Sequence, residues 1–168
     1  FNLIAGSLKT SAGEILLKGQ PIQNVPSHTR IRLGLGRTFQ IPRPFAGMTV
    51  LENMVLAAQG QSGEAIFPNW LLPGRVAVEE RRNSDKAMAL LELVELTRLA
   101  HEPARNLSGG QRKLLELARI LMADPEIILL DEPAAGVNPT LLEVLIAKIA
   151  EINRRGVTLL IVEHNMDV

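Results

Sequence analysis

Cysteine is absent from this chain of 168 residues, and neither sign of charge is in excess. Without cysteine the chain has no disulfide framework and no thiolate metal site, which fits a reducing compartment, and the cytosol is the expected one. Its 18 lysine and arginine residues balance 18 aspartate and glutamate residues, so there is no basic excess to hold a phosphate backbone. Nucleic acid is therefore not expected as a partner.

Long apolar runs are also missing. The best of them, residues 127–130 and 158–162, have the length of a strand and fall far short of the ~18 apolar residues that a membrane-spanning helix needs. Any membrane association is therefore expected to go through a partner. The chain opens on Phe1 without an initiator methionine and without the pattern of a signal peptide, which indicates a part of a longer protein.

The apolar residues that are present, 46% of the chain, suffice for the core of one domain with a lobe attached. The last third of the chain alternates helix and strand. A helix from residue 109 to about 122 precedes the apolar run 127–130, and a helix that Asn138 can cap precedes the apolar run 157–162. The first run is continuously apolar, as a parallel strand covered on both faces should be, and the second is predicted to be the next buried strand. Strand, helix and strand at this spacing form a βαβ unit, so the fold class is α/β.

The first part of the chain contributes two further strands and then changes to helices. Residues 13–19 form a short apolar run between glycines, and residues 34–40 indicate a strand that ends at Gln40. Thr49 and Glu52 then form a capping box, which predicts a helix start. From Val78 onward, apolar residues recur at helical spacing and predict another helix.

The segment between the two predicted helices is a loop or insertion. Residues 59–75 contain several glycines and prolines, show no period, and carry the only tryptophan, Trp70. The predicted organisation of the chain is therefore a core segment (1–40), a mainly helical subdomain with this insertion (41–106), and a second core segment (107–168).

Two adjacent carboxylates follow the first buried strand. Ligands of open parallel sheets sit outside the carboxyl ends of the strands, and Asp131 and Glu132 come directly after the apolar run 127–130. One carboxylate can hold a magnesium ion while the other orients or deprotonates an attacking water. The plain alternative is a solvated strand end, which so apolar a strand followed by Pro133 makes the weaker interpretation.

The second strand also ends in polar residues, Glu163 and His164. An imidazole at a strand end can donate a hydrogen bond to a terminal phosphate as charge builds on it. A single histidine is more often structural or merely exposed, and we interpret His28 and His101 in that way.

Residues 108–111 combine a capping box with two glycines. Ser108 and Gln111 have the spacing of such a box, which is a common structural feature. The box does not explain Gly109 and Gly110, because glycine costs helix stability and is tolerated where a backbone must approach a ligand closely. Free N–H groups at a helix start also form an anion site. We therefore expect both a cap and a phosphate contact here.

Together these motifs resemble the ATPase subunit of ABC transporters. Residues 107–111 (LSGGQ) resemble the ABC signature, 127–132 (IILLDE) the Walker B strand, and 136–138 (GVN) the D-loop, with Asn138 where many members have aspartate. His164 resembles the switch histidine and Gln40 the Q-loop glutamine. Five motifs in one order and at one spacing are far more specific than any single motif.

The resemblance implies a fold, ligands and partners. The implied fold is a P-loop NTPase (RecA-like) parallel-sheet core with a mainly α-helical ABC subdomain, incomplete at the N-terminus. ATP and Mg²⁺ are the implied ligands. The resemblance implies that Gln40 and Asp131 bind the metal, and that Glu132, which activates water, and His164 are the catalytic residues. The residues that the resemblance places on nucleotide are Gln40, Ser108, Gly109, Gly110, Gln111, Asp131 and Asn138. A second ABC ATPase subunit, identical or different, holds the ATP that the signature contacts.

One family motif is absent. The phosphate-binding sequence Gly-x-x-x-x-Gly-Lys-Ser/Thr, known as Walker A, occurs nowhere in the chain. In family members this loop immediately precedes a segment that resembles residues 1–6 (FNLIAG), so the chain is expected to begin just downstream of it. We therefore expect the 168 residues alone to bind ATP weakly or not at all, and the full-length protein to be a competent ATPase.

Within the family, several segments resemble the larger ATPase subunit of branched-chain amino acid importers. They are residues 36–40 (GRTFQ), 48–53 (MTVLEN), 133–139 (PAAGVNP), 163–166 (EHNM) and the insertion around Trp70. The resemblance implies transmembrane permease partners, an indirect link to a solute-binding protein, and a peripheral location at the cytoplasmic face of the cell membrane. Amide and urea importers and the lipopolysaccharide-export ATPase share much of the pattern and are alternatives. A soluble ABC ATPase working on DNA or ribosomes is the alternative of another class, which the neutral charge disfavours.

Overall fold

The computed structural model describes residues 1–38, 43–59 and 73–163, and at its centre is a parallel sheet of three strands. Strand β4 (Ile127–Asp131) lies between β3 (Leu35–Arg37) and β5 (Thr158–Val162). β4 pairs with β5 along its whole length, so the two strands end side by side. The connection from β4 through a helix to β5 is the predicted βαβ unit, and the α/β class is confirmed.

The two predicted buried strands differ in burial. Ile128, Leu129 and Leu130 of β4 are each at most 1% exposed, as expected for a strand covered on both faces. In β5, however, Leu160 is 41% and Ile161 is 44% exposed, so the prediction of a second buried strand is wrong. The reason is position, because β5 is an edge strand of the described sheet and pairs only with β4 there.

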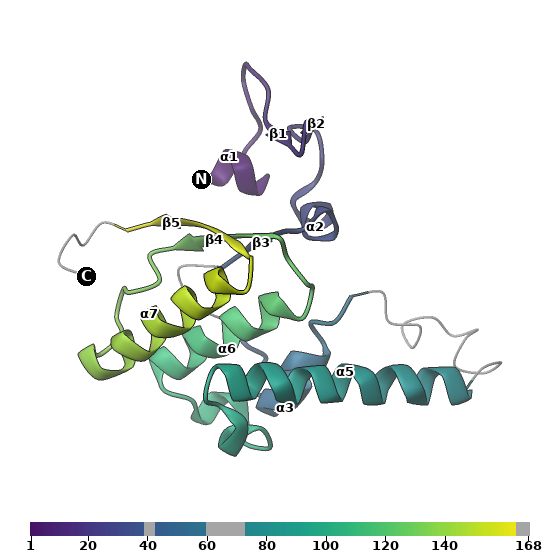
Figure 1. Cartoon of the computed structure of the whole chain (residues 1–168), viewed down its shortest axis with the longest axis vertical. Coiled ribbons are helices and arrows are strands. Elements are labelled where there is room, and N and C mark those ends of the chain that lie inside the picture. The colour runs from purple at the N-terminus through teal and green to yellow at the C-terminus, as the bar shows by residue number, and fades with distance from the viewer. Residues whose placement is uncertain (39–42, 60–72, 164–168) are drawn as a thin grey trace.

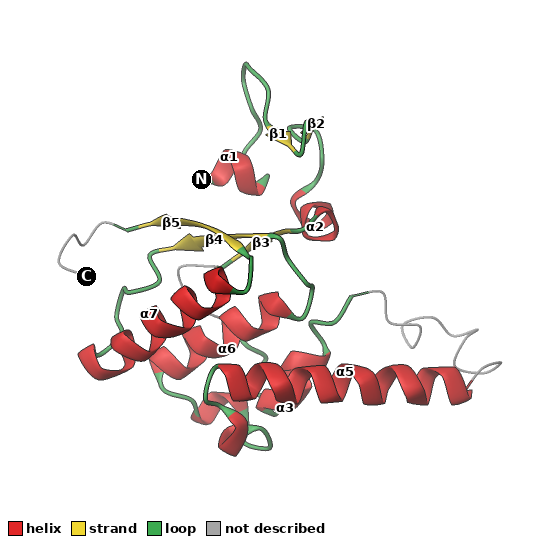
Figure 2. Ribbon diagram, viewed as in Figure 1, coloured by secondary structure: helices red, strands yellow, loops and turns green. Residues whose placement is uncertain are grey.

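Helices α6 (Gly109–Leu121) and α7 (Pro139–Arg154) lie together on one face of the sheet (Figure 2). Both begin where the sequence predicts. α7 is capped by Asn138, whose side-chain oxygen accepts a hydrogen bond from the Leu141 N–H at 2.9 Å. Pro139 fills the first helical position, where its missing N–H leaves no intrahelical bond unmade.

The N-terminal segment lies on the opposite face of the sheet (Figure 1). It comprises α1 (Asn2–Ala5), an antiparallel hairpin of β1 (Leu16–Leu17) and β2 (Gln20–Pro21), α2 (Ser27–Arg30) and a 3₁₀ turn (Ile31–Leu33). The buried guanidinium of Arg30 fastens this segment, because it donates to the backbone oxygens of Leu3 and Val25, each at 2.9 Å.

Both predicted N-terminal strands are shorter than expected. The run 13–19 gives only the two residues of β1, because Lys18 and Gly19 take positive φ angles of 52° and 76° and turn the chain back into β2. The strand predicted to end at Gln40 is β3, which ends at Arg37. Gln40 itself lies outside the described residues.

The helical part contains α3 (Val50–Val55), α5 (Pro73–Leu93) and two 3₁₀ turns (Thr97–Leu99 and Ala104–Asn106). α3 starts at the predicted box of Thr49 and Glu52, and both hydrogen bonds of the box are present. α5 begins at Pro73, inside the segment predicted as a loop to residue 75, because proline is favoured in the first turn of a helix. Residues 60–72, with Trp70, lie outside the described part of the chain.

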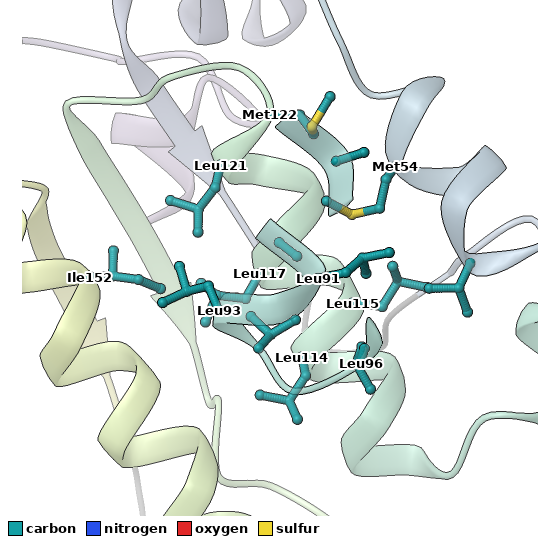
Figure 3. Packing of buried hydrophobic residues seen from close by; sticks show 14 of the residues in the cluster. Met54, Leu91, Leu93, Leu96, Leu114, Leu115, Leu117, Leu121, Met122 and Ile152 are labelled. Atoms are coloured by element: carbon teal, nitrogen blue, oxygen red, sulfur yellow. The ribbon is translucent and has the colours of Figure 1, made fainter. Parts of the chain in front are cut away.

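One apolar core joins the helices to the sheet. Met54 of α3, Leu91 of α5 and Leu115 of α6 are fully buried in one apolar cluster (Figure 3). The same cluster includes Ile128 of β4. Burying one such side chain contributes about 1.5–3 kcal/mol. Because this core runs without a break across residue 106, the division into segments 1–40, 41–106 and 107–168 stays a prediction. Among the helices described, none has the length and apolar character needed to cross a membrane.

Candidate functional site

The predicted carboxylates lie at one end of the sheet. In the pairing of β4 with β5, Asp131 stands opposite Val162, so Glu132 and Glu163 leave the two strands side by side. The Glu132 N–H donates to the Val162 oxygen at 2.9 Å, and the Ala134 N–H donates to the Glu163 carboxylate at 2.8 Å. His164 lies outside the described residues, so its predicted place here is untested.

Asp131 is held from the neighbouring strand. Its backbone N–H donates to the hydroxyl of Thr38 at 3.3 Å, and its carboxylate pairs with the guanidinium of Arg37 at 3.4 Å. Arg37 also donates to the side chains of Asn2 and Ser7, both at 2.7 Å. This arginine therefore links the N-terminal segment to the carboxylate. Sequence reasoning placed Arg37 in a predicted strand and in a resemblance, and it missed this contact.

Glu132 sits in an unusual backbone conformation. Its φ angle is +46°, in the left-handed region that residues other than glycine rarely adopt. Residues held there cluster at functional sites, where the surrounding structure over-determines them. A side chain that sequence reasoning also missed supplies part of that support, because the ammonium of Lys113 donates to the backbone oxygens of Glu132 at 3.1 Å and Pro133 at 2.9 Å.

The start of α6 carries the predicted phosphate-contacting residues. The Gln111 N–H donates to the Ser108 hydroxyl at 3.2 Å, and the Ser108 N–H donates to the Gln111 side-chain oxygen at 2.8 Å, so the predicted capping box is complete. Ser108 and Gly109 are exposed. The box satisfies two N–H groups, and the helix start at Ser108 and Gly109 is left open to solvent, where its amides favour an anion.

The surroundings of the two glycines in this turn differ. A β-carbon on Gly110 would stand 2.1 Å from the Cδ2 atom of Leu141 and 3.3 Å from Val137, so α6 packs closely on α7 at Gly110 and a side chain there would displace Leu141. A β-carbon on Gly109 would meet nothing nearer than the Gly136 oxygen at 4.0 Å. The packing supplies a second reason for Gly110 beside the predicted approach of a ligand. That approach stays a prediction for both glycines.

Asn138 is exposed, and its side-chain oxygen is engaged by the cap of α7. The described structure gives Asn138 this structural role, and its contact with nucleotide stays a prediction. Gln40 cannot be placed relative to the other site residues, because residues 39–42 are outside the described chain.

A cleft of about 900 Å³ opens beside Asp131. Its lining includes Asn2, Arg37, Arg43, Phe45 and Arg119. Burial lowers the pKa of the Arg119 guanidinium, and its charged group lies over the Phe45 ring, 5.7 Å from the ring centre. The cleft connects the carboxylate end of β4 with the chain that leads into α3.

The residues at the end of β4 fit a magnesium ion that is bound together with phosphate. Mg²⁺ prefers oxygen ligands and is usually held by one or two carboxylates, with water and substrate phosphates completing its shell. Asp131 offers such a carboxylate. In the described part of the chain, no group of three or more His, Cys, Asp or Glu side chains is placed to hold a metal by itself. The donor set thus fits a metal that arrives with phosphate oxygens.

Known proteins are similar to this chain in sequence, and solved structures are similar to it in fold. A protein of Archaeoglobus fulgidus named "Probable branched-chain amino acid transport ATP-binding protein LivG" is 44% identical over 168 residues, which are 100% of this chain and 64% of that protein. The high-affinity branched-chain amino acid transport ATP-binding protein LivG of Escherichia coli is 38% identical over 99% of this chain and 66% of its own length. This chain therefore spans less than two thirds of the length of either relative.

A crystal structure of a nucleotide-free ATP-binding cassette from an ABC transporter superposes with a TM-score of 0.80 at 36% identity, covering 99% of this chain and 65% of that one. The agreement confirms the predicted cassette fold. The family model described as "ABC transporter" matches residues 1–135, about four fifths of the 168 residues. The chain belongs to the ABC transporter family.

Proposed function

We propose that this chain is the greater part of an ATP-hydrolysing subunit of an ABC importer. The observation that carries the proposal is the end of β4, where Asp131 and Glu132 follow a fully buried strand and Glu132 is held with its backbone in the left-handed region. A solvated strand end would have no need of such a backbone. ATP hydrolysis by the whole protein supplies the work for transport.

We assign a role in hydrolysis to four of the predicted residues. The carboxylate of Glu132 orients an attacking water and accepts its proton. Asp131 and Gln40 would hold Mg²⁺, which would neutralise charge on the phosphate oxygens. His164 donates a hydrogen bond to the terminal phosphate.

The start of α6 serves a second nucleotide. Residues 108–111 form a helix terminus to which the phosphates of an ATP held by a second ATPase subunit can bind, and Ser108 and Gly109 are its exposed part. Gly110 keeps α6 close to α7, and Asn138 begins the neighbouring helix. Two subunits therefore enclose ATP between them, and each supplies half of each site.

Branched-chain amino acids are the proposed solute, because the relatives named above carry that description. The proposed partners are membrane permease subunits and, through them, a solute-binding protein. The proposed location is the cytoplasmic face of the cell membrane. The balanced charge gives no support to nucleic acid as a partner.

The hydrolytic proposal is tested with the full-length protein and with the 168-residue chain. Full-length protein is expected to hydrolyse ATP, and Glu132→Gln is expected to keep ATP binding while lowering the rate by about 100-fold or more. The 168-residue chain, which has no Walker A sequence, is expected to show no micromolar affinity in an ATP titration. Full hydrolytic activity of Glu132→Gln would refute the assigned role.

The transport proposal is tested by what copurifies with the tagged full-length protein and by uptake. Membrane permease subunits are expected in the complex, and proteoliposomes of that complex with its solute-binding protein are expected to accumulate leucine, isoleucine or valine. Copurified nucleic acid would favour a soluble ABC ATPase. Uptake of an amide or urea, or extraction of lipopolysaccharide, would reassign the solute and leave the ATPase role intact.

A further inference from the structure

A single lysine side chain joins two parts of the molecule that the proposed function uses separately. Lys113 belongs to α6, five residues after Ser108, and reaches the turn that follows β4. Its ammonium donates to three backbone oxygens, those of Glu132 at 3.1 Å, Pro133 at 2.9 Å and Ala135 at 2.5 Å. An ammonium has three N–H groups, so this contact uses all of its donors.

The turn that Lys113 holds is the one that carries Glu132. The positive φ of Glu132 costs on the order of 1–3 kcal/mol and persists only if neighbours enforce it. The Ala135 N–H closes the turn on the Glu132 oxygen at 3.1 Å, and Glu163 takes the Ala134 N–H from the side of β5. Lys113 binds the carbonyl oxygens of the same turn from α6.

Lys113 is placed for this task at a cost. Burial lowers the pKa of its ammonium, and the carboxylates of Glu163, Glu116 and Glu132 offset part of that shift. A packing role alone would be met by an uncharged side chain without the cost of removing an ammonium from water. The convergence of three carbonyl oxygens on one charged donor is what an uncharged side chain cannot reproduce.

We propose that Lys113 is a positioning residue that ties the start of α6 to the catalytic turn, so that phosphate contact at Ser108 and Gly109 is linked mechanically to the orientation of Glu132. Because α6 serves the ATP of the second subunit and Glu132 acts on the ATP of its own, Lys113 couples the two nucleotide sites of a dimer. This inference rests on the proposed function. It adds a residue with no contact to nucleotide to the residues that set the rate of hydrolysis.

The test compares Lys113→Met with Lys86→Met in the full-length protein. Lys86 is a matched control, because its ammonium donates to the Met122 oxygen at 2.9 Å and so holds the other end of α6, away from Glu132. Lys113→Met is expected to lower kcat for ATP by about 10- to 100-fold while the KM changes less than about threefold. Lys86→Met is expected to keep kcat within about twofold of wild type, whatever its effect on the melting temperature.

Lys113→Gln keeps two N–H donors and is expected to give an intermediate kcat, which preserves the comparison if the methionine variant does not fold. Equal losses of kcat in Lys113→Met and Lys86→Met would overturn the proposal, as would a kcat of Lys113→Gln within about twofold of wild type. A rise in KM alone would overturn it as well. The proposed function fails separately, if wild-type full-length protein does not hydrolyse ATP.

Discussion

The helices α3 and α6 begin with the same local device and present it to different surroundings. In both, a hydroxyl at the N-cap accepts the N–H three residues on, and the side chain at that third position accepts the N-cap N–H in return. The first residue of α3 is Val50, which is fully buried, whereas the first residue of α6 is Gly109, which is exposed. One helix start is closed by its own core, and the other is left open.

The third residue of each box also differs. Glu52 brings a negative charge to the start of α3, while Gln111 makes the same hydrogen bond at α6 without a charge. A carboxylate beside an open helix start would repel a phosphate, and an amide does not. The comparison teaches that a capping box alone does not indicate a ligand site. The exposure and charge of the residues in the box determine whether an anion can bind at the helix start.

The largest expected effect is a loss of stability when the side-chain hydrogen bonds of Asn53 in α3 are removed. Asn53 is fully buried, and its side chain donates to the Thr49 oxygen at 2.9 Å and accepts the Phe45 N–H at 2.8 Å. Asn53→Ala removes the acceptor of the Phe45 N–H and leaves a cavity at a fully buried position, whereas the Thr49 oxygen keeps its bond from the backbone N–H of residue 53 at 3.0 Å. The variant is expected to lower the free energy of unfolding by about 2–3 kcal/mol. Urea unfolding of the full-length protein measures the loss. Asn106→Ala, at an exposed residue with one side-chain bond to Glu102, serves as the control and is expected to cost less than about 0.5 kcal/mol.

The next effect separates the two glycines of α6. Gly110→Ala drives a methyl group into Leu141, and the overpacking is expected to exceed the gain in helix propensity, for a net loss of about 1–2 kcal/mol. Gly109→Ala has room for its methyl group and is expected to be at least as stable as wild type, while ATP turnover of the full-length protein falls by about tenfold or more. Thermal unfolding and turnover are measured on both variants. Normal turnover in a stable Gly109→Ala would remove the open helix start from the site.

A smaller change in stability accompanies removal of either cap. Thr49→Ala and Ser108→Ala each delete one side-chain hydrogen bond to a helix N–H and are expected to cost about 1 kcal/mol. The two variants should then diverge, because only Ser108→Ala is expected to impair ATP hydrolysis. Matched melting temperatures with unequal turnover would sharpen the comparison of the two helix starts. Equal turnover would contradict it.

The smallest effect is a dependence on pH that only the α3 box should show. Hydrogen bonds from the Thr49 backbone and then its hydroxyl lower the pKa of Glu52 from 4.5. Because the folded-state pKa is depressed, the contribution of Glu52 is fully present above about pH 4.5 and is lost as the pH falls through the lower folded value. The melting temperatures of wild type and Glu52→Gln are compared from about pH 6 to pH 3, and their difference should shrink toward acid. A constant difference would show that the Glu52 charge is not involved.

Sequence patterns predicted most of the elements whose cause is local. The starts of α3, α6 and α7 follow from side chains within three residues of the cap, and the burial of β4 follows from an unbroken apolar run. Patterns failed where the cause lies far along the chain. The exposure of β5 depends on which strands flank it, and the close packing at Gly110 involves Leu141, 31 positions later.

The candidate site divides in the same way. Asp131 and Glu132 were predicted from the strand before them, and the register of β4 with β5 brings them to one edge with Glu163. The contacts of Arg37 with Asp131 and of Lys113 with the turn were not predicted, because each joins residues at least 19 positions apart. No local pattern marks an arginine or lysine for such a contact. Gln40 and His164 remain sequence predictions, since both lie outside the described residues.

The exposed edge of β5 has a practical consequence for anyone who prepares these 168 residues on their own. Among the described residues this edge pairs with no further strand, and with its exposed Leu160 and Ile161 it forms a template on which a strand of another molecule can pair. The formal net charge is zero at pH 7, so little electrostatic repulsion would keep such molecules apart. The isolated chain is therefore expected to self-associate near neutral pH, and a longer version that covers this edge should stay dispersed.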